Sequence, residues 1–160
     1  MKQVLIIAFI FASLQSKAQD IKKWSLDDLK SAISNANGPT IFNFWATFCK
    51  PCIAEIPHFQ QLAEKYKQQG VQLYLISVDE KSAYPSKIES FVQKRKWTAP
   101  VVYLNETNAD LLCPAVDNGW SGAIPATLII NNKTGFRKFF EEEMSKESLE
   151  NEILKMLRNR

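Results

Sequence analysis

The segment from residue 40 to about residue 69 constrains the fold of this chain more than any other part of its sequence. Residues 40–46 (TIFNFWA) are mostly aromatic or β-branched, as in a strand that is covered on both faces. A long helical pattern starts at about Lys50, and Pro51 fits its first turn, where a missing backbone N–H costs nothing. Cys49 and Cys52 stand at this junction, where they form a redox pair, a metal site or a structural staple.

The rest of the chain alternates helices with strands in the same way. Apolar periodicity predicts further helices at 26–34, 86–96 and 107–112 and after Ser145, and strands at 71–78, 100–104, 126–130 and 136–140. The last two strands form a hairpin through the turn at 131–135. A length of 160 residues is that of one ordinary domain. We therefore predict an α/β fold with a mixed central sheet, mostly parallel with an antiparallel edge, flanked by helices.

The N-terminal residues differ from the remainder. A basic start at Lys2 is followed by an apolar run over residues 4–14 and by Ser16-Lys17-Ala18, a small-x-small cleavage signature. The run is too short to span a bilayer comfortably. We predict a signal peptide over residues 1–18, a mature domain over residues 19–160, and export to the periplasm or cell envelope. The alternative is an uncleaved membrane anchor.

Charge and cysteine content narrow the function classes. Cleavage after Ala18 leaves 18 basic and 17 acidic residues, a near-neutral balance that gives no argument for a nucleic-acid or membrane-surface partner, and we expect no nucleic-acid partner. Export places the chain in an oxidising compartment, where a cysteine pair becomes a disulfide unless something reduces it. The chain has three cysteines, so one thiol is left over.

The positions of the paired cysteines predict different roles for them. Cys49 lies at the positive end of the helix, where free backbone N–H groups favour thiolate over thiol and depress the thiol pKa. Lys50 adds a smaller effect in the same direction. Cys52 belongs to the core-facing stripe of the helix, which predicts a buried partner. Cys49 would attack a substrate disulfide, and Cys52 would resolve the resulting mixed disulfide.

Glu55 follows Cys52 by about one helical turn and lies at the edge of the core face. Burial there would raise its pKa and let it exchange a proton with the Cys52 thiol. The alternative is a solvated helix residue. Pro57 also falls inside this helix, and because the apolar stripe continues to Tyr66 we expect a kink rather than a helix end.

A strand, the motif F-W-A-x-x-C-x-P-C and a proline five residues after the second cysteine together resemble the active-site segment of the thioredoxin fold. The match is closer to the TlpA/ResA-like branch of exported thiol–disulfide oxidoreductases. That branch is similar in its C-x-P-C pair, in an asparagine at the position of Asn43 and in a glutamate at that of Glu55. The resemblance covers most of residues 24–158. It implies a thioredoxin-like fold in which the helix and strand at 86–104 are an insertion.

The same resemblance implies a cis-proline across a groove from the cysteine pair, where Pro125 precedes the strand at 126–130. An ordinary trans proline is the alternative. A cis bond would expose backbone groups to an extended substrate segment. The residues implied in substrate binding are Trp45, Lys50, Pro51, Ile124 and Pro125, although core packing explains Trp45 equally well. The sequence departs from the family where Phe48 replaces a common tryptophan, and Lys50 stands in place of glycine.

The resemblance also implies what the protein acts on and with. It suggests an enzyme that reduces protein disulfides, such as those of apocytochrome c or other oxidised envelope proteins, as a monomer and without a cofactor or metal. An exported reductant needs electrons from a membrane-bound donor. The direction of electron flow stays open, because potentials on this fold run from about −270 mV for reductants to about −120 mV for a strong oxidant.

Two other functions remain as alternatives. A carrier of zinc or copper(I) would need four ligands, for which the candidates are Cys49, Cys52, Cys113 and His58. A thiol peroxidase on the same fold would need a Thr-x-x-Cys motif, and Thr47 is two residues before Cys49 rather than three.

The remaining polar and thiol residues carry weaker signals. Cys113 precedes Pro114, which disfavours helix at that position. It is a spare buried thiol, a partner for an intermolecular bond or a third member of the site. His58 falls opposite Cys49 on the helical wheel, so we expect it to face solvent. Asp79, just past a strand end, is expected to cap or bond a loop, and residues 141–143 (EEE) to form a solvated edge.

Overall fold

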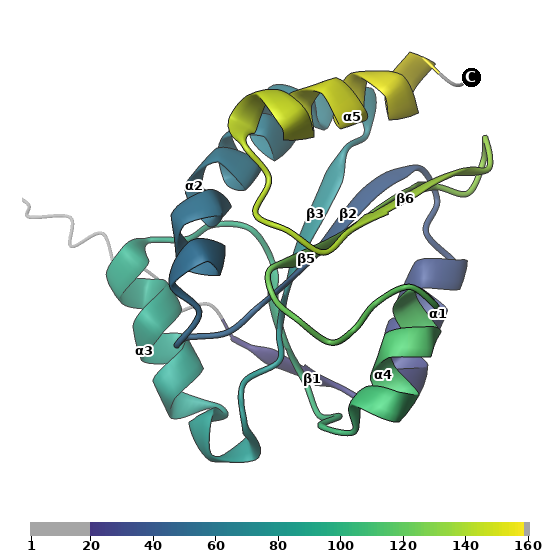
Figure 1. The fold of residues 1–160 in the computed structure, drawn as a ribbon. Helices are drawn as coiled ribbons and strands as arrows, with labels where there is room; N and C mark the ends of the chain where they lie inside the picture. The colour runs from purple at the N-terminus through teal and green to yellow at the C-terminus, as the bar shows by residue number, and fades with distance from the viewer. Residues whose placement is uncertain (1–19, 159–160) are drawn as a thin grey trace, which may run out of the picture.

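The computed structural model describes residues 20–158, so the predicted signal peptide lies outside the described residues. Figure 1 shows the alternation of strands and helices. The strands are β1 (Lys22–Trp24), β2 (Pro39–Trp45), β3 (Gln72–Ser77), β4 (Val101–Leu104), β5 (Ala126–Asn131) and β6 (Phe136–Phe140). The helices are α1 (Leu26–Ser34), α2 (Lys50–Lys65), α3 (Ser86–Arg95), α4 (Ala109–Val116) and α5 (Lys146–Arg158), with short 3₁₀ turns η1 (Lys67–Gln69) and η2 (Lys81–Ala83). None of the helices within residues 20–158 is long and apolar enough to cross a membrane.

The strands form one mixed sheet in the order β1-β4-β3-β2-β5-β6. The first four strands in this order run parallel, whereas β5 is antiparallel to β2 and β6 is antiparallel to β5. The predicted sheet is therefore confirmed, and the expected insertion is present as α3 and β4. The carboxyl ends of β2, β3 and β4 share one edge, because Trp45 pairs with Ser77 and Ser77 with Tyr103.

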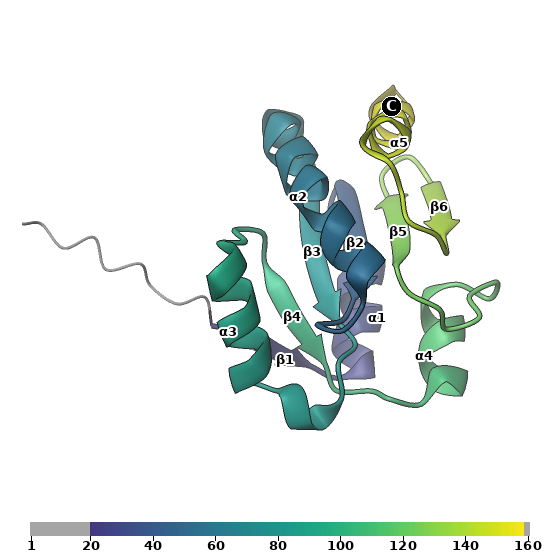
Figure 2. The same cartoon turned by 60° about the vertical axis from the view of Figure 1, so that its left-hand side comes forward.

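Helices cover both faces of this sheet (Figure 2). Side chains alternate along β2, so Ile41 joins the core shared with α2, α3 and α5, whereas Phe42 and Phe44 join the core shared with α1 and α4. A strand with an apolar core on each face has apolar residues at nearly every position of its sequence, which explains the pattern of residues 40–46. The chain leaves β2 at the carboxyl edge and enters α2 at once, which places the cysteine pair at that edge.

Some local predictions are confirmed and others are wrong. α2 continues through Pro57 and ends at Lys65, short of the expected end near Gln69. A 3₁₀ turn over Lys67–Gln69 follows, and Gly70, with a positive φ of 87°, ends that turn rather than α2. The helix predicted at 107–112 instead runs to Val116 and includes Cys113 and Pro114. Apolar side chains of α4 are buried in the core, and this packing offsets the hydrogen bond that a proline loses inside a helix. The three-residue strand β1 has too short a pattern to be predicted.

Candidate active site

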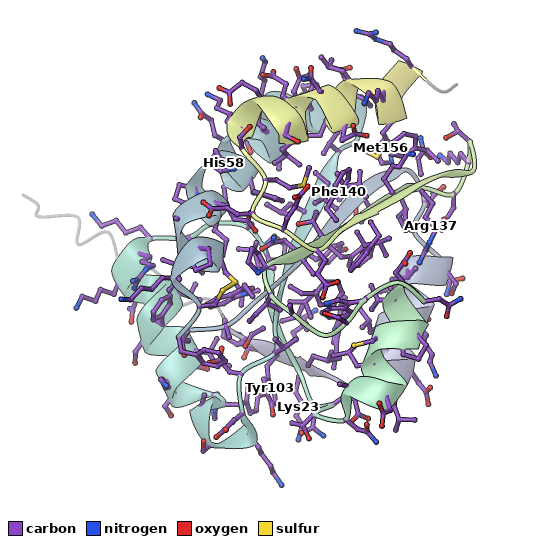
Figure 3. All side chains as sticks on the ribbon, in the orientation of Figure 1. Lys23, His58, Tyr103, Arg137, Phe140 and Met156 are labelled. Atoms are coloured by element: carbon purple, nitrogen blue, oxygen red, sulfur yellow. A yellow bond between two sulfur atoms is a disulfide. The ribbon has the colours of Figure 1, made fainter. Side chains whose placement is uncertain are left out.

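Cys49 and Cys52 form a disulfide at the start of α2, drawn as a yellow bond in Figure 3. Cys49 caps the helix, and its Sγ accepts the backbone N–H of Cys52 at 3.3 Å. Cys52 is fully buried, while Cys49 keeps an exposed fraction of 7%. In the reduced protein the same N–H and the helix dipole would stabilise a Cys49 thiolate. The geometry thus agrees with an attacking Cys49 and a resolving Cys52.

Asp79, which follows β3 and is almost fully buried, holds the loop before Cys49. Its carboxylate accepts the backbone N–H of Thr47 at 3.0 and 3.1 Å, the Thr47 hydroxyl at 2.5 Å and the Ser77 hydroxyl at 2.8 Å. The expected loop role of Asp79 is confirmed. The Thr47 hydroxyl therefore donates to Asp79, and this threonine stands two residues before Cys49 rather than the three of a Thr-x-x-Cys motif.

Glu55 is a buried carboxyl group, with no exposed surface, rather than a solvated one. Its Oε1 accepts a hydrogen bond from Asn43 Nδ2 and its Oε2 accepts one from the backbone N–H of Met144, both at 2.8 Å. Asn43 Nδ2 also donates to Thr127 Oγ1 at 3.1 Å. Side chains or backbone from α2, β2 and the segment before α5 therefore meet at one carboxyl group, and Asn43 links it to Thr127 of β5.

This environment determines how Glu55 titrates. Burial raises its pKa to about 7, while the hydrogen bonds from Met144 and Asn43 act to lower it and the charge of Glu143 adds a smaller rise. Both neutral and charged forms of the group are then populated near neutral pH. This titratable carboxyl group lies about one helical turn after Cys52 on the same helix.

The loop before β5 brings Ile124 against the cysteine pair. The Ile124–Pro125 peptide bond is cis, as the resemblance implies. The carbonyl oxygen of Ile124 lies 3.8 Å from Cys49 Sγ, although the two residues are 75 positions apart. Lys50 and Pro51 are exposed at the start of α2, and Ile124 is half-buried. Two segments that are far apart in the sequence, the start of α2 and the loop before β5, therefore border Cys49.

Two aromatic residues near the pair have different surroundings. Trp45 is fully buried and packs against Trp97 and Phe91, with ring centroids 4.9 and 5.7 Å away. Its ring supports the base of the loop from the α3 side, as core packing alone predicts. Phe48, directly before Cys49, is 67% exposed, so its aromatic ring is open to solvent beside the cysteine pair.

The remaining cysteine and the histidine have other partners. Cys113 is buried in α4, and burial raises the pKa of its thiol, with smaller rises from the charges of Glu141 and Asp110. His58 is half-buried, and its Nε2 lies 2.8 Å from the carbonyl oxygen of Met144 (Figure 3). It therefore does not simply face solvent, because the segment before α5 packs over this part of α2. The described part of the chain contains no group of three or more His, Cys, Asp or Glu side chains that could hold a metal ion.

A thioredoxin-like fold with a Cys-x-x-Cys disulfide at the start of α2 defines a thiol–disulfide oxidoreductase. A family model described as the AhpC/TSA family matches residues 10–138. ResA of Geobacillus kaustophilus, a thiol-disulfide oxidoreductase, is 29% identical over 140 residues, which cover 86% of this chain and 75% of that protein. ResA of Bacillus thuringiensis subsp. konkukian is 30% identical over 141 residues, covering 82% and 71%. The crystal structure of StoA from Bacillus subtilis matches with a TM-score of 0.58 at 26% identity, covering 75% of this chain and 85% of that chain. The chain belongs to the AhpC/TSA family and, within it, is a ResA-like thiol–disulfide oxidoreductase.

Proposed function

We propose that this chain is an exported reductant that passes two electrons from Cys49 and Cys52 to disulfides of envelope proteins. The observation that carries the proposal is the Cys49–Cys52 disulfide at the start of α2, with the Ile124 carbonyl 3.8 Å from Cys49 Sγ. Residues 1–18 act in this proposal as a cleaved signal peptide, and the mature domain from residue 19 works in the periplasm or cell envelope. The basic start, apolar run and small-x-small signature support export.

The proposed reaction has two exchange steps. The Cys49 thiolate attacks one sulfur of the disulfide in the substrate protein, here called the client. The client S–S bond breaks, and the other client sulfur leaves as a thiolate that takes up a proton. Cys52 then gives its proton to the Glu55 carboxylate and attacks Cys49 Sγ. The second client sulfur leaves, the Cys49–Cys52 disulfide forms, and the client has gained two electrons.

The same exchange chemistry indicates which kind of protein is the client and that an electron donor is needed. Backbone groups of Ile124 and the exposed face formed by Phe48, Lys50 and Pro51 suit an extended protein segment, such as the disulfide-bonded region of apocytochrome c. An oxidising compartment does not regenerate a dithiol, so a membrane-bound donor must return the electrons. All of the groups named come from one copy of the chain, so the reaction needs neither a second copy nor a cofactor.

A single-turnover experiment tests the proposal. The mature domain, reduced beforehand and freed of reductant, is mixed with a synthetic peptide that carries one Cys-x-x-Cys disulfide. We expect one equivalent of peptide dithiol for each Cys49–Cys52 disulfide formed, detected by alkylation and mass spectrometry. Protein alkylated before mixing is the control. Reduced protein that leaves the peptide oxidised while it reacts with the small disulfide dithiodipyridine would overturn the proposed client class.

A further inference from the structure

Glu141 contacts the loop before β5. In the hairpin, Phe140 at the end of β6 (Figure 3) pairs with Thr127 of β5, so the next residue faces the chain that leads into β5. Glu141 Oε1 accepts the backbone N–H groups of Ser121 and Ala123 at 3.1 and 2.9 Å and also the Ser121 hydroxyl. Its Oε2 lies 3.2 Å from the same Ser121 nitrogen. The expected solvated edge at 141–143 is therefore wrong for Glu141.

The two bonded N–H groups flank a glycine of the loop before β5. Gly122, between Ser121 and Ala123, has a positive φ of 97°, a region that glycine adopts easily. Trp120 Nε1 donates to the Ala123 carbonyl at 2.8 Å, which secures the same stretch from its other side. Ile124 is the next residue, and its carbonyl is the group that reaches Cys49. The carboxylate thus anchors the loop immediately before the backbone that borders the sulfur.

The charge state of Glu141 suits this task. Its bonds to the Ser121 side chain and backbone hold its pKa below the ordinary value, so the carboxylate is ionised at neutral pH. Hydrogen bonds to a charged acceptor are stronger than neutral ones. The two following glutamates, Glu142 and Glu143, are exposed, and they provide neighbours of the same type without this contact.

We propose that Glu141 is a positioning residue that holds the 121–124 backbone in the arrangement to which an extended protein client binds. The inference rests on the proposed function, because it concerns how the same site receives a polypeptide. The proposal distinguishes client binding from the sulfur chemistry of the cysteine pair. Client binding depends on Glu141, whereas the chemistry between Cys49 and Cys52 does not, since Glu141 touches neither sulfur.

The experiment compares Glu141→Gln with Glu142→Gln in the full mature domain. Single-turnover rates are measured against increasing concentrations of the Cys-x-x-Cys disulfide peptide. For Glu141→Gln we expect the half-saturating peptide concentration to rise about tenfold, which corresponds to about 1.4 kcal/mol. The maximal rate, the rate with dithiodipyridine and the reduction potential should match those of wild type. Glu142→Gln should match wild type in every respect.

A second variant and a wild-type control distinguish failure of this inference from failure of the proposed function. Ser121→Ala removes only the hydroxyl bond, so it should shift half-saturation in the same direction by a smaller factor, even if Glu141→Gln folds poorly. Equal half-saturation for wild type, Glu141→Gln and Ser121→Ala would overturn the inference while leaving the proposed function intact. A wild-type protein that reacts with dithiodipyridine and not with the peptide would instead remove the proposed function.

Discussion

Replacing Cys49 by serine is expected to slow the reduction of a peptide disulfide by about a thousandfold or more. A serine hydroxyl is not ionised at neutral pH and cannot form a mixed disulfide, so the first exchange step is lost. The buried position of Cys52 prevents it from taking over, because a client sulfur cannot approach a side chain with no exposed surface. Stopped-flow Trp fluorescence of the reduced variant, mixed with the Cys-x-x-Cys disulfide peptide, measures the rate.

Two other cysteine variants show whether the roles are assigned correctly. Cys52→Ser keeps the Cys49 nucleophile and lacks the resolving thiol, so a protein–peptide mixed disulfide should accumulate and be visible by mass spectrometry. Cys113→Ala should react at nearly the wild-type rate, because Cys113 is buried in α4. The assignment is contradicted by a trapped mixed disulfide on Cys52 in Cys49→Ser, or by a rate loss in Cys113→Ala as large as that in Cys49→Ser.

Glu55→Gln is expected to remove a pH dependence of stability worth about 3 kcal/mol. The pKa of Glu55 is about 7 in the folded protein, against an ordinary value of 4.5. Between these values the folded state holds a proton that the unfolded state has lost, so wild-type stability falls by about 1.4 kcal/mol per pH unit from this group. The contribution is complete below pH 4.5 and lost as pH rises through 7.

Glutamine cannot ionise, and the site can accept it. Its carbonyl can take the Met144 N–H. Asn43 Nδ2 is the atom that faces residue 55 in the wild type, so the Asn43 amide turns over to present Oδ1, which has no partner within the described residues, to the glutamine amide. Urea unfolding from pH 4.5 to pH 8 should therefore show the variant gaining about 3 kcal/mol relative to wild type. Glu64→Gln, an exposed substitution on the same helix, should run parallel to wild type. A Glu55→Gln curve that also runs parallel would contradict a buried, neutral-pH carboxyl group.

The parts of the site that are local in sequence could be predicted from sequence. A buried strand, a short loop and a helix that starts at Cys49 are adjacent along the chain, and their periodicity carries the information directly. The burial of Glu55 follows from the position of this residue beside the apolar stripe of α2. The cis bond before Pro125 followed from the family resemblance, since apolar patterns alone do not distinguish cis from trans proline.

The long-range partners could not be predicted in the same way. Met144 is 89 residues from Glu55, and Thr127 is 84 residues from Asn43. These contacts exist because β5 inserts next to β2 and the chain returns over α2 before α5, an arrangement that no local pattern records. Glu141 illustrates the problem, because a run of three glutamates resembles a solvated surface until the β5–β6 register places the first one beside Ser121.

The central claim is that Cys49 and Cys52 form a reversible couple that donates electrons, and its reduction potential tests this most directly. The mature domain is equilibrated with dithiothreitol buffers of graded ratio, followed by Trp fluorescence and confirmed by alkylation of the free thiols. We predict a two-electron transition at or below about −270 mV, in the range of reductants on this fold. A value near −120 mV would make the protein an oxidant, and the absence of a Cys49–Cys52 transition would contradict the redox function itself.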